Sequence, residues 1–158
     1  MAFSISIKAD GESPIMAVMT KLAGFDKSAM FDEIGSELVT STQLRFHDQH
    51  DVEGNPWKQS WRAKMQGGQT LRDTGRLMNS MTHNVLPNGV EVGTNVDYAH
   101  VLHFGADIMP KVAQYLTFNV GGQWRKVKQV NIPARPFLGI NADDERMILD
   151  IIEEHILG

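Results

Sequence analysis

The stretch Ile132-Pro-Ala-Arg-Pro-Phe-Leu-Gly139 constrains the backbone more tightly than any other part of this sequence. Pro133 and Pro136 fix their own φ angles and bias the residue before each of them away from helical geometry. The segment is therefore predicted to be extended and stiff, with Arg135 presented on a rigid spacer. The apolar residues after Pro136 are expected to anchor that spacer to a core.

A helix is predicted to begin directly after this segment. Asn141 is a suitable N-cap residue, and Asp143, Asp144 and Glu145 place negative charge in the first turn, where the helix dipole favours it. The apolar residues that follow form one stripe at helical spacing, namely Met147, Ile148, Ile151, Ile152 and Ile156. We expect a C-terminal helix that docks on the core and ends at Gly158.

Upstream of this region, hydrophobic periodicity predicts further helices. A short amphipathic helix is predicted from Ser13 to Leu22, and a longer one from about Asp26 to His47. Gly35 is unfavourable inside the longer helix, because glycine costs a helix interior about 1 kcal/mol relative to alanine. Thr70 and Asp73 loosely resemble a capping box, which predicts that another helix follows them.

Turn residues separate the remaining elements. Residues 51–69 are predicted to form a loop anchored by Trp57 and Trp61, and residues 97–104 to form one or two helical turns ending at Gly105. Hairpins are predicted at 85–92, through Pro87-Asn88-Gly89, and at 115–130, through Gly121-Gly122. The expected fold class is α+β, with a small, mainly antiparallel sheet made of the N-terminal strand and both hairpins, packed by the long helix and the C-terminal helix.

Length and composition indicate one globular domain over residues 1–158, because 42% hydrophobic side chains suffice for a core of this size. The sequence has no cysteine, which excludes disulfides and thiolate metal sites and fits assembly in a reducing cytoplasm. Residues 1–8 alternate like a strand rather than a signal peptide, and no segment approaches the roughly 20 apolar residues that span a bilayer. We therefore expect no membrane partner.

The charges are segregated along the chain, although the net charge is only −4. Residues 111–135 contain five basic residues and no Asp or Glu, whereas residues 141–158 contain six acidic residues and Arg146 as the single Lys or Arg. Residues 26–53 are also acidic, and the section that follows them is basic. These blocks are either solvated faces of separate elements or complementary patches that meet between copies of the protein.

Sequence motifs give little support to enzymatic chemistry. The sequence contains no G-x-S-x-G, no H-E-x-x-H and no Gly-rich phosphate loop. Two histidine pairs, His47 with His50 and His100 with His103, have the i, i+3 spacing that places two imidazoles on one helical face. Spacing alone does not define a metal site, so we expect no enzyme, metal or cofactor, while a metal-dependent hydrolase remains a competing hypothesis.

The second predicted hairpin is basic and carries a tryptophan. Arg125, Lys126 and Lys128 could neutralise phosphates while Trp124 stacks on a base, so residues 123–130 are an alternative candidate for a nucleic-acid-binding module. The net acidic chain and the lack of a recognition motif argue against specific nucleic-acid binding. Trp57 and Trp61 either anchor their loop or contribute to an interface, where tryptophan is enriched.

Four sequence blocks, at 54–57, 71–77, 92–105 and 132–139, together resemble the phage virion morphogenesis family, which includes tail completion proteins of contractile-tailed, Mu-like phages and prophages. The resemblance covers roughly residues 46–157, and the stretch from Ala106 to Asn131 is longer than in compact members. It is carried by Trp57, Leu71, Thr74, Gly75, Leu77, Gly93, Tyr98, Ala99, His103, Phe104, Gly105, Pro133, Arg135, Pro136, Phe137 and Gly139.

The resemblance implies a structural protein that acts late in virion assembly, in tail completion or head-tail joining at the neck. It also implies a ring of identical subunits, with a hexamer expected from the symmetry that such components generally share, located in the virion or in the host cytoplasm during assembly. Our mechanistic hypothesis is that the basic hairpin of one subunit meets an acidic helix of the next. The predicted interface residues are Trp57, Trp61, Trp124, Arg125, Lys126, Lys128 and Arg135.

Overall fold

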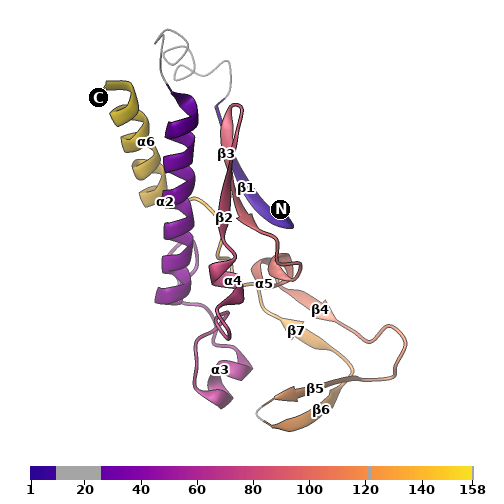
Figure 1. Cartoon of the computed structure of the whole chain (residues 1–158). Coiled ribbons are helices and arrows are strands. Elements are labelled where there is room, and N and C mark those ends of the chain that lie inside the picture. The colour runs from indigo at the N-terminus through magenta and orange to yellow at the C-terminus, as the bar shows by residue number, and fades with distance from the viewer. Residues whose placement is uncertain (10–25, 121, 158) are drawn as a thin grey trace.

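The computed structural model describes residues 1–9, 26–120 and 122–157 of the chain, so the helix predicted at 13–22 lies outside the described residues. The remaining elements confirm the α+β class (Figure 1). Their order is β1 (Phe3–Lys8), α2 (Lys27–Asp48), α3 (Trp61–Gln66), α4 (Arg76–Asn79), β2 (Thr82–Leu86), β3 (Gly89–Thr94), α5 (Ala99–Phe104), β4 (Ala106–Ile108), β5 (Leu116–Val120), β6 (Gln123–Val127), β7 (Val130–Ile132) and α6 (Ala142–Leu157).

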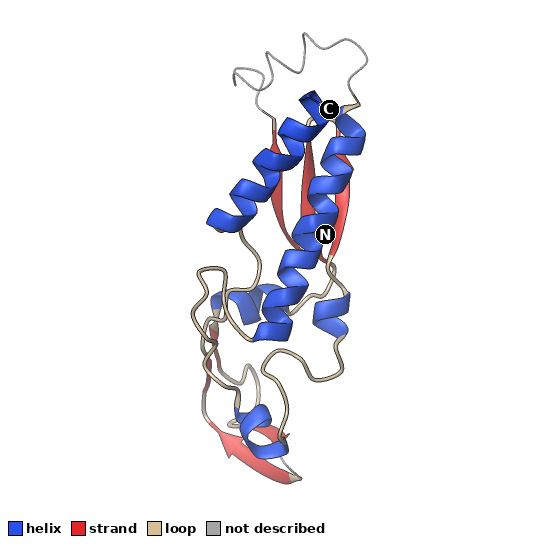
Figure 2. Cartoon of the chain, turned by 90° about the vertical axis from the view of Figure 1, so that its left-hand side faces the viewer, coloured by secondary structure: helices blue, strands red, loops and turns tan. Residues whose placement is uncertain are grey.

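The core lies between a three-stranded antiparallel sheet and two helices. The strand order is β1-β3-β2, with Ile5 opposite Val92 and Val85 opposite Val90. Helix α2 covers one face of this sheet and α6 packs beside α2, as the two views show (Figures 1 and 2). The opposite face is polar, and on it Ser4 donates a hydrogen bond to Glu91 at 2.8 Å. The alternation of apolar and polar residues therefore gives the sheet one face that packs on α2 and one face that is exposed to solvent.

Helix α2 confirms the predicted long helix and explains its unexpected glycine. Asp26 is the N-cap, and its carboxylate accepts a hydrogen bond from the Ala29 amide at 3.1 Å. A Cβ atom at Gly35 would lie 2.5 Å from Cδ2 of His83 and 2.7 Å from Cγ2 of Val90. Glycine at this position lets the helix approach the sheet more closely than any other residue would allow.

The hairpin predicted at 85–92 is confirmed as β2 and β3, and the short helix before Gly105 is confirmed as α5. The hairpin predicted at 115–130 also forms, but the expectation that it joins the main sheet was wrong. Among the described residues, strands β5 and β6 pair only with each other, and β7 leaves the hairpin to pair with β4. Four successive residues of β6, 123–126, are all exposed, so this strand has no apolar face to pack on the core. We call residues 106–132 the arm, because they extend away from the main layers (Figure 1).

The polar region before α4 also differs from its prediction. Residues 61–66 form helix α3 rather than a loop, because the Ser60 side chain caps it by accepting from the Ala63 amide at 3.2 Å. The helix predicted after Thr70 and Asp73 starts only at Arg76 and is four residues long. Leu71 has φ +61°, which is incompatible with a helix there, and the Thr70 hydroxyl accepts from the Ser60 amide instead of capping.

Candidate assembly interface

The segment from Ile132 to Gly139 runs through the centre of the described structure. Phe137 is fully buried and its ring packs against Phe46 at 5.3 Å, His103 at 5.2 Å and Phe3 at 5.9 Å between centroids. These partners come from α2, α5 and β1. The predicted anchoring of the segment to a core is therefore confirmed, and Phe137 is the residue that joins three elements.

The backbone of this segment is held by side chains from other elements. The Trp57 indole donates to the Pro136 carbonyl at 3.0 Å, and Nη1 of Arg45 donates to the carbonyls of Phe137 and Gly139 at 3.1 and 3.2 Å. Strand β7 ends at Ile132, and no other described strand pairs with the extended segment after it. These side chains therefore satisfy backbone polar groups that would otherwise be buried without hydrogen bonds.

His103 contributes to the same packing as a neutral acceptor. Its Nδ1 accepts from the amides of Phe137 and Leu138 at 3.4 and 3.5 Å, which requires this nitrogen to be unprotonated. Burial lowers the pKa of the His103 imidazole, because desolvation penalises the charged form. Gly105 follows with φ +77°, and a Cβ atom there would lie 2.6 Å from the Ile132 carbonyl oxygen. His103 and Gly105 therefore both allow α5 to pack closely against the proline segment, His103 through its hydrogen bonds and Gly105 through its lack of a side chain.

Helix α6 is fixed to α2 by a buried ion pair that the sequence analysis did not identify. Arg45 and Asp144 are 2% and 4% exposed, and Nη2 lies 2.5 Å from Oδ2. The Asp144 carboxylate also accepts from the Ser41 hydroxyl at 2.6 Å and from the Asn141 amide at 3.1 Å. The Asn141 side chain in turn accepts from the Asp144 amide at 2.8 Å, which confirms the predicted N-cap.

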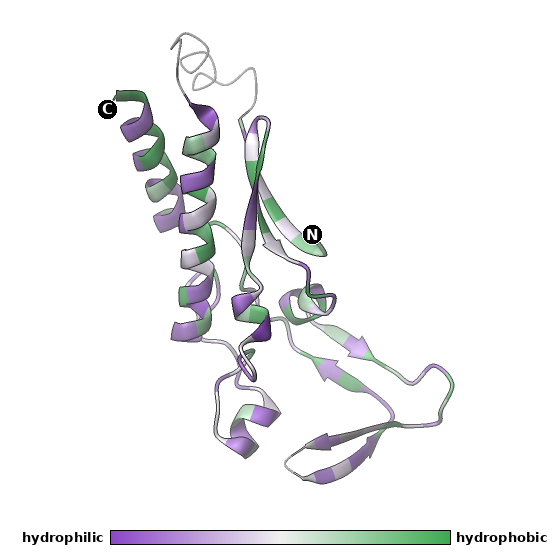
Figure 3. Ribbon diagram, viewed as in Figure 1, coloured by the Kyte–Doolittle hydropathy of each residue, from purple (hydrophilic) through white to green (hydrophobic). Residues whose placement is uncertain are grey.

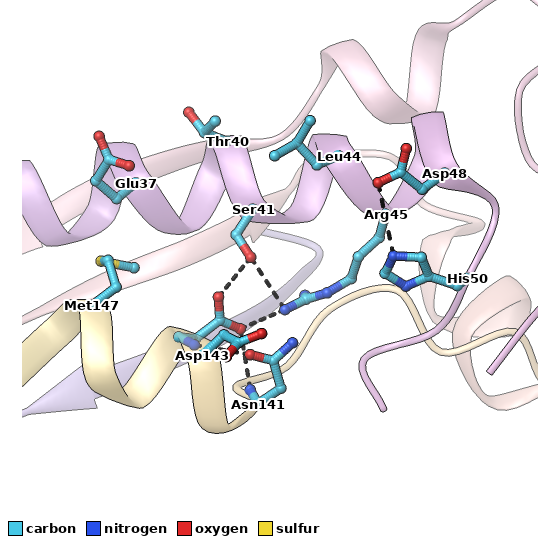
Figure 4. Close-up of a pocket in the computed structure, with 11 residues that line it drawn as sticks. Glu37, Thr40, Ser41, Leu44, Arg45, Asp48, His50, Asn141, Asp143 and Met147 are labelled. Carbon is cyan, nitrogen blue, oxygen red and sulfur yellow. Dashed lines mark hydrogen bonds and ion pairs between the residues drawn. The ribbon is translucent and has the colours of Figure 1, made fainter. Parts of the chain in front are cut away.

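An acidic groove lies beside this ion pair, between α2 and the first turn of α6 (Figure 4). Its volume is about 290 Å³, and the exposed carboxylates of Glu37, Asp48 and Asp143 line it together with the apolar side chains of Leu44 and Met147. Negative charge also continues along α6 beyond the groove. There, four exposed carboxylates form no ion pair within the described residues, namely Glu145, Asp150, Glu153 and Glu154.

The arm presents the opposite charge together with exposed apolar side chains. Arg125, Lys126 and Lys128 are exposed on or just after β6, and Trp124 is 72% exposed. Helix α3 lies against β5 and adds Trp61, which is 55% exposed. Hydrophilic and hydrophobic residues are interspersed along the arm (Figure 3). Large exposed apolar side chains of this kind are typical of interaction sites.

Two predicted interface residues lie inside the protein instead. Trp57 is 8% exposed because its ring packs on Phe46 and its indole nitrogen serves the proline segment. Arg135 is 6% exposed, so the expectation that the stiff spacer presents it at the surface was wrong. Its Nε donates to the Lys58 carbonyl at 2.7 Å and its amide donates to the Leu102 carbonyl at 3.0 Å. These two bonds turn the side chain inward.

The histidine pairs do not form a metal site in the described part of the chain, where no cluster of three or more suitable ligands occurs. His47 contacts Asp48 at 3.0 Å, and His50 lies 3.9 Å from the same carboxylate. His100 is exposed and bonds to the Asp97 carbonyl, whereas His103 is buried. The two members of the second pair therefore face different surroundings.

Residues 12–157 match the phage virion morphogenesis family, so the match extends further towards the N-terminus than the four sequence blocks do. The chain belongs to this family. Its role is structural, in phage assembly, and it is not an enzyme. Within the described residues no helix combines the length and the apolar character needed to cross a membrane.

Two relatives place this virion morphogenesis protein among phage and prophage proteins. It is 37% identical over 106 residues to the Mu-like prophage FluMu G protein 2 of Haemophilus influenzae, which covers 66% of this chain and 63% of that protein. The chain thus spans less than two thirds of that relative. It is 25% identical over 147 residues to tail completion protein S of Escherichia phage P2, which covers 92% of this chain and 94% of that protein. No solved structure matches.

Most motif residues of this family member have a structural explanation. Pro133, Pro136, Phe137 and Gly139 belong to the central segment, while His103 and Gly105 lie at its contact with α5. Tyr98 and Phe104 are different, because they are 43% and 67% exposed. The Tyr98 ring lies under Arg76, with the guanidinium carbon 5.9 Å from the ring centroid.

Proposed function

We propose that this protein acts in tail completion or head-tail joining at the neck of the phage particle, as a ring of identical subunits. In this ring, the arm of one subunit binds the acidic groove of the next. The partners are then other copies of the chain and phage tail or connector proteins, in the virion or in the host cytoplasm during assembly. A hexamer fits the symmetry expected of such components.

The observation that carries this proposal is the separation of opposite charges onto two different surfaces of the molecule. The arm holds exposed Arg125, Lys126 and Lys128, whereas the groove between α2 and α6 holds the carboxylates of Glu37, Asp48 and Asp143. The two surfaces are formed by different elements, so one molecule can use both at once (Figure 1). Contacts between two different surfaces are heterologous and close into a ring when the rotation between subunits allows it.

Charge reversal of the arm tests this arrangement. Lys126→Glu combined with Lys128→Glu places negative charge opposite the acidic groove, so we expect self-association, measured by sedimentation velocity and electron microscopy, to weaken by at least about tenfold. The matched control is Lys8→Glu combined with Lys27→Glu, which makes the same charge change at the far end of the main layers and should leave association intact. Unchanged assembly of the arm variant would contradict the proposed contact.

Electron microscopy of the purified protein with and without isolated phage tails tests the place of action. We expect the protein without tails to form rings. In the mixture with tails, we expect added density at the head-proximal end of the tails. Density at the distal tip, or no tail binding by assembled rings, would contradict a role in completing the neck end.

A second candidate function is nucleic-acid binding by residues 123–130, which the exposure of Trp124 next to Arg125 and Lys126 favours. Binding of this kind releases counterions, so the affinity for duplex or single-stranded DNA would fall steeply with salt. Trp124→Ala and Lys126→Ala would both reduce it. DNA binding by the monomer, without self-association, would favour this function over the ring.

A further inference from the structure

A second pocket, separate from the acidic groove, lies where α4, α5 and the proline segment meet. Its volume is about 230 Å³, and Leu71, Leu77 and Leu102 supply its apolar lining. Ser60, Tyr98 and Arg135 also line it. The pocket is therefore an apolar recess that contains one deeply buried cationic side chain.

The guanidinium of Arg135 is not neutralised within the described structure. The side chain is more than nine-tenths buried, yet no carboxylate of the described residues lies within ion-pairing distance of it. Only one of its five N–H donors has a partner there, the Nε–H that binds the Lys58 carbonyl. Among the described residues no side-chain nitrogen is both sealed from solvent and without a partner, so the Nη atoms of Arg135 remain open to solvent at the pocket. A carboxylate that enters the pocket can therefore pair with a guanidinium that no protein carboxylate neutralises.

The other charged groups at the pocket do not neutralise the Arg135 guanidinium. Asp73 is the acidic residue of the lining, but its carboxylate lies 3.5 Å from Arg62 and is mostly exposed. Arg76, over the ring of Tyr98, adds further positive charge nearby. The pocket and its rim therefore carry an excess of positive charge.

We propose that this pocket binds a carboxylate side chain of a second copy of the chain, supplied by the exposed acidic face of α6. The proposal rests on the ring proposed above and names a second contact within it. A glutamate fits the recess chemically, because its aliphatic stem can pack on the three leucines while its carboxylate makes a bidentate pair with the guanidinium. Helix α6 offers Asp150, Glu153 and Glu154, which form no ion pair within the described part of the chain.

The pocket itself is tested on the unmodified chain with a small carboxylate. Glutarate carries a carboxylate on an aliphatic stem, and its binding can be followed by NMR through the nitrogen-15 signals of the Arg135 side chain, assigned with the Arg135→Lys variant. We expect these signals to shift with glutarate and to stay unchanged with neutral glutaramide. No glutarate response, or an equal response to glutaramide, would overturn the pocket. A stronger response to inorganic phosphate than to glutarate would overturn the carboxylate as its ligand.

A double-mutant cycle tests the second copy as the source of that carboxylate. One variant is Arg135→Gln, and the other combines Asp150→Asn, Glu153→Gln and Glu154→Gln. We expect each to weaken self-association by about tenfold and their combination to weaken it little further, because both remove the same contact. Lys64→Gln is the control, since it removes one exposed charge on α3 outside the pocket. Additive losses would overturn the pairing.

The two experiments separate this proposal from the ring. Self-association without a glutarate response would overturn the proposed carboxylate pocket but not the proposed ring. A glutarate response in a chain that stays monomeric at all concentrations would overturn the proposed ring and, with it, the second copy as the source of the carboxylate. If Arg135→Gln fails to fold, the glutarate titration of the unmodified chain still decides the pocket.

Discussion

At the scale of single residues, two buried polar groups hold the proline segment in place. His103 accepts hydrogen bonds from two backbone amides of that segment, and Arg45 donates to two of its carbonyls. Neither group can be replaced by an apolar residue without leaving backbone atoms unsatisfied. Each therefore gives a prediction about stability.

His103 should make the protein less stable in mild acid. Burial lowers its folded-state pKa below the ordinary value of about 6.5, so below that pH the unfolded state binds more protons than the folded state. The stability contributed by the neutral imidazole is complete above about pH 6.5 and is lost as the pH falls towards the folded pKa. Urea titrations from pH 7.5 to 5 should show this loss, at no more than about 1.4 kcal/mol per pH unit.

His103→Asn is the matched control for that measurement. The amide oxygen keeps an acceptor near the position of Nδ1 but does not titrate, so the loss of stability between pH 6.5 and 5 should become smaller. An identical pH profile for the variant would show that other groups cause the acid sensitivity.

The pair of Arg45 and Asp144 should behave as a unit. Asp144→Asn leaves a buried guanidinium without its counter-ion and should cost about 3 kcal/mol of unfolding free energy. Arg45→Met combined with Asp144→Asn removes both charges and should cost less than the sum of the two single variants. Urea denaturation of the three variants measures the coupling, and simple additivity would contradict a direct interaction.

At the scale of elements, the sequence predicts those whose side chains interact locally. The periodicity of α2, the Asn141 cap of α6 and the Pro87-Asn88-Gly89 turn are all local features, and each prediction was confirmed. Helix α3 was missed because its pattern is polar and only its Ser60 cap indicated a start. The placement of β7 beside β4 depends on contacts 24 residues apart, such as Asn131 with Asp107, which no local pattern specifies.

The same distinction applies to the candidate interface. Exposure of Trp124 and of the arm's basic residues follows from a strand that has no apolar face. The inward turn of Arg135 depends instead on the carbonyls of Lys58 and Leu102, which belong to distant parts of the chain. Arg45 could have been noticed as a charge within the apolar arc of α2, between Leu38 and Phe46.

Gly35 gives a prediction at the element scale. Alanine is the better helix former by about 1 kcal/mol, but its methyl group would clash with His83 and Val90. We expect Gly35→Ala to lower the unfolding free energy by about 1 to 3 kcal/mol, as overpacking does. Ser36→Ala, at the exposed neighbouring position, is the control and should be neutral or slightly stabilising. A stabilised Gly35→Ala variant would mean that α2 can move away from the sheet at little cost.

At the scale of the whole molecule, the arm is attached to the core but contributes little to it. No described residue of 106–132 belongs to the buried core cluster, and within the part of the chain that the structure describes β5 and β6 pair only with each other. Folding and assembly are therefore predicted to depend on different parts of the chain.

Removal of the outer arm tests this separation. Ile108 and Val130 are opposite each other in the β4–β7 pair, so an Asn-Gly turn can replace residues 109–129. We expect the thermal midpoint of the shortened chain to stay within about 4 °C of the parent, since removal of the arm should change the unfolding free energy by less than about 1 kcal/mol. Self-association should be lost. Retained association would place the interface elsewhere, and a large fall in the midpoint would show that the arm supports the core.

The positions of the three tryptophans give the protein a built-in optical probe. The indole of Trp57 is shielded and hydrogen-bonded to a carbonyl, whereas those of Trp61 and Trp124 are open to water. Emission from the unassembled chain should be dominated at long wavelengths by the two hydrated indoles, and covering them should shift it to the blue. Assembly can thus be followed by intrinsic fluorescence without a dye. The Trp124→Phe variant would show how much of the emission shift comes from the arm.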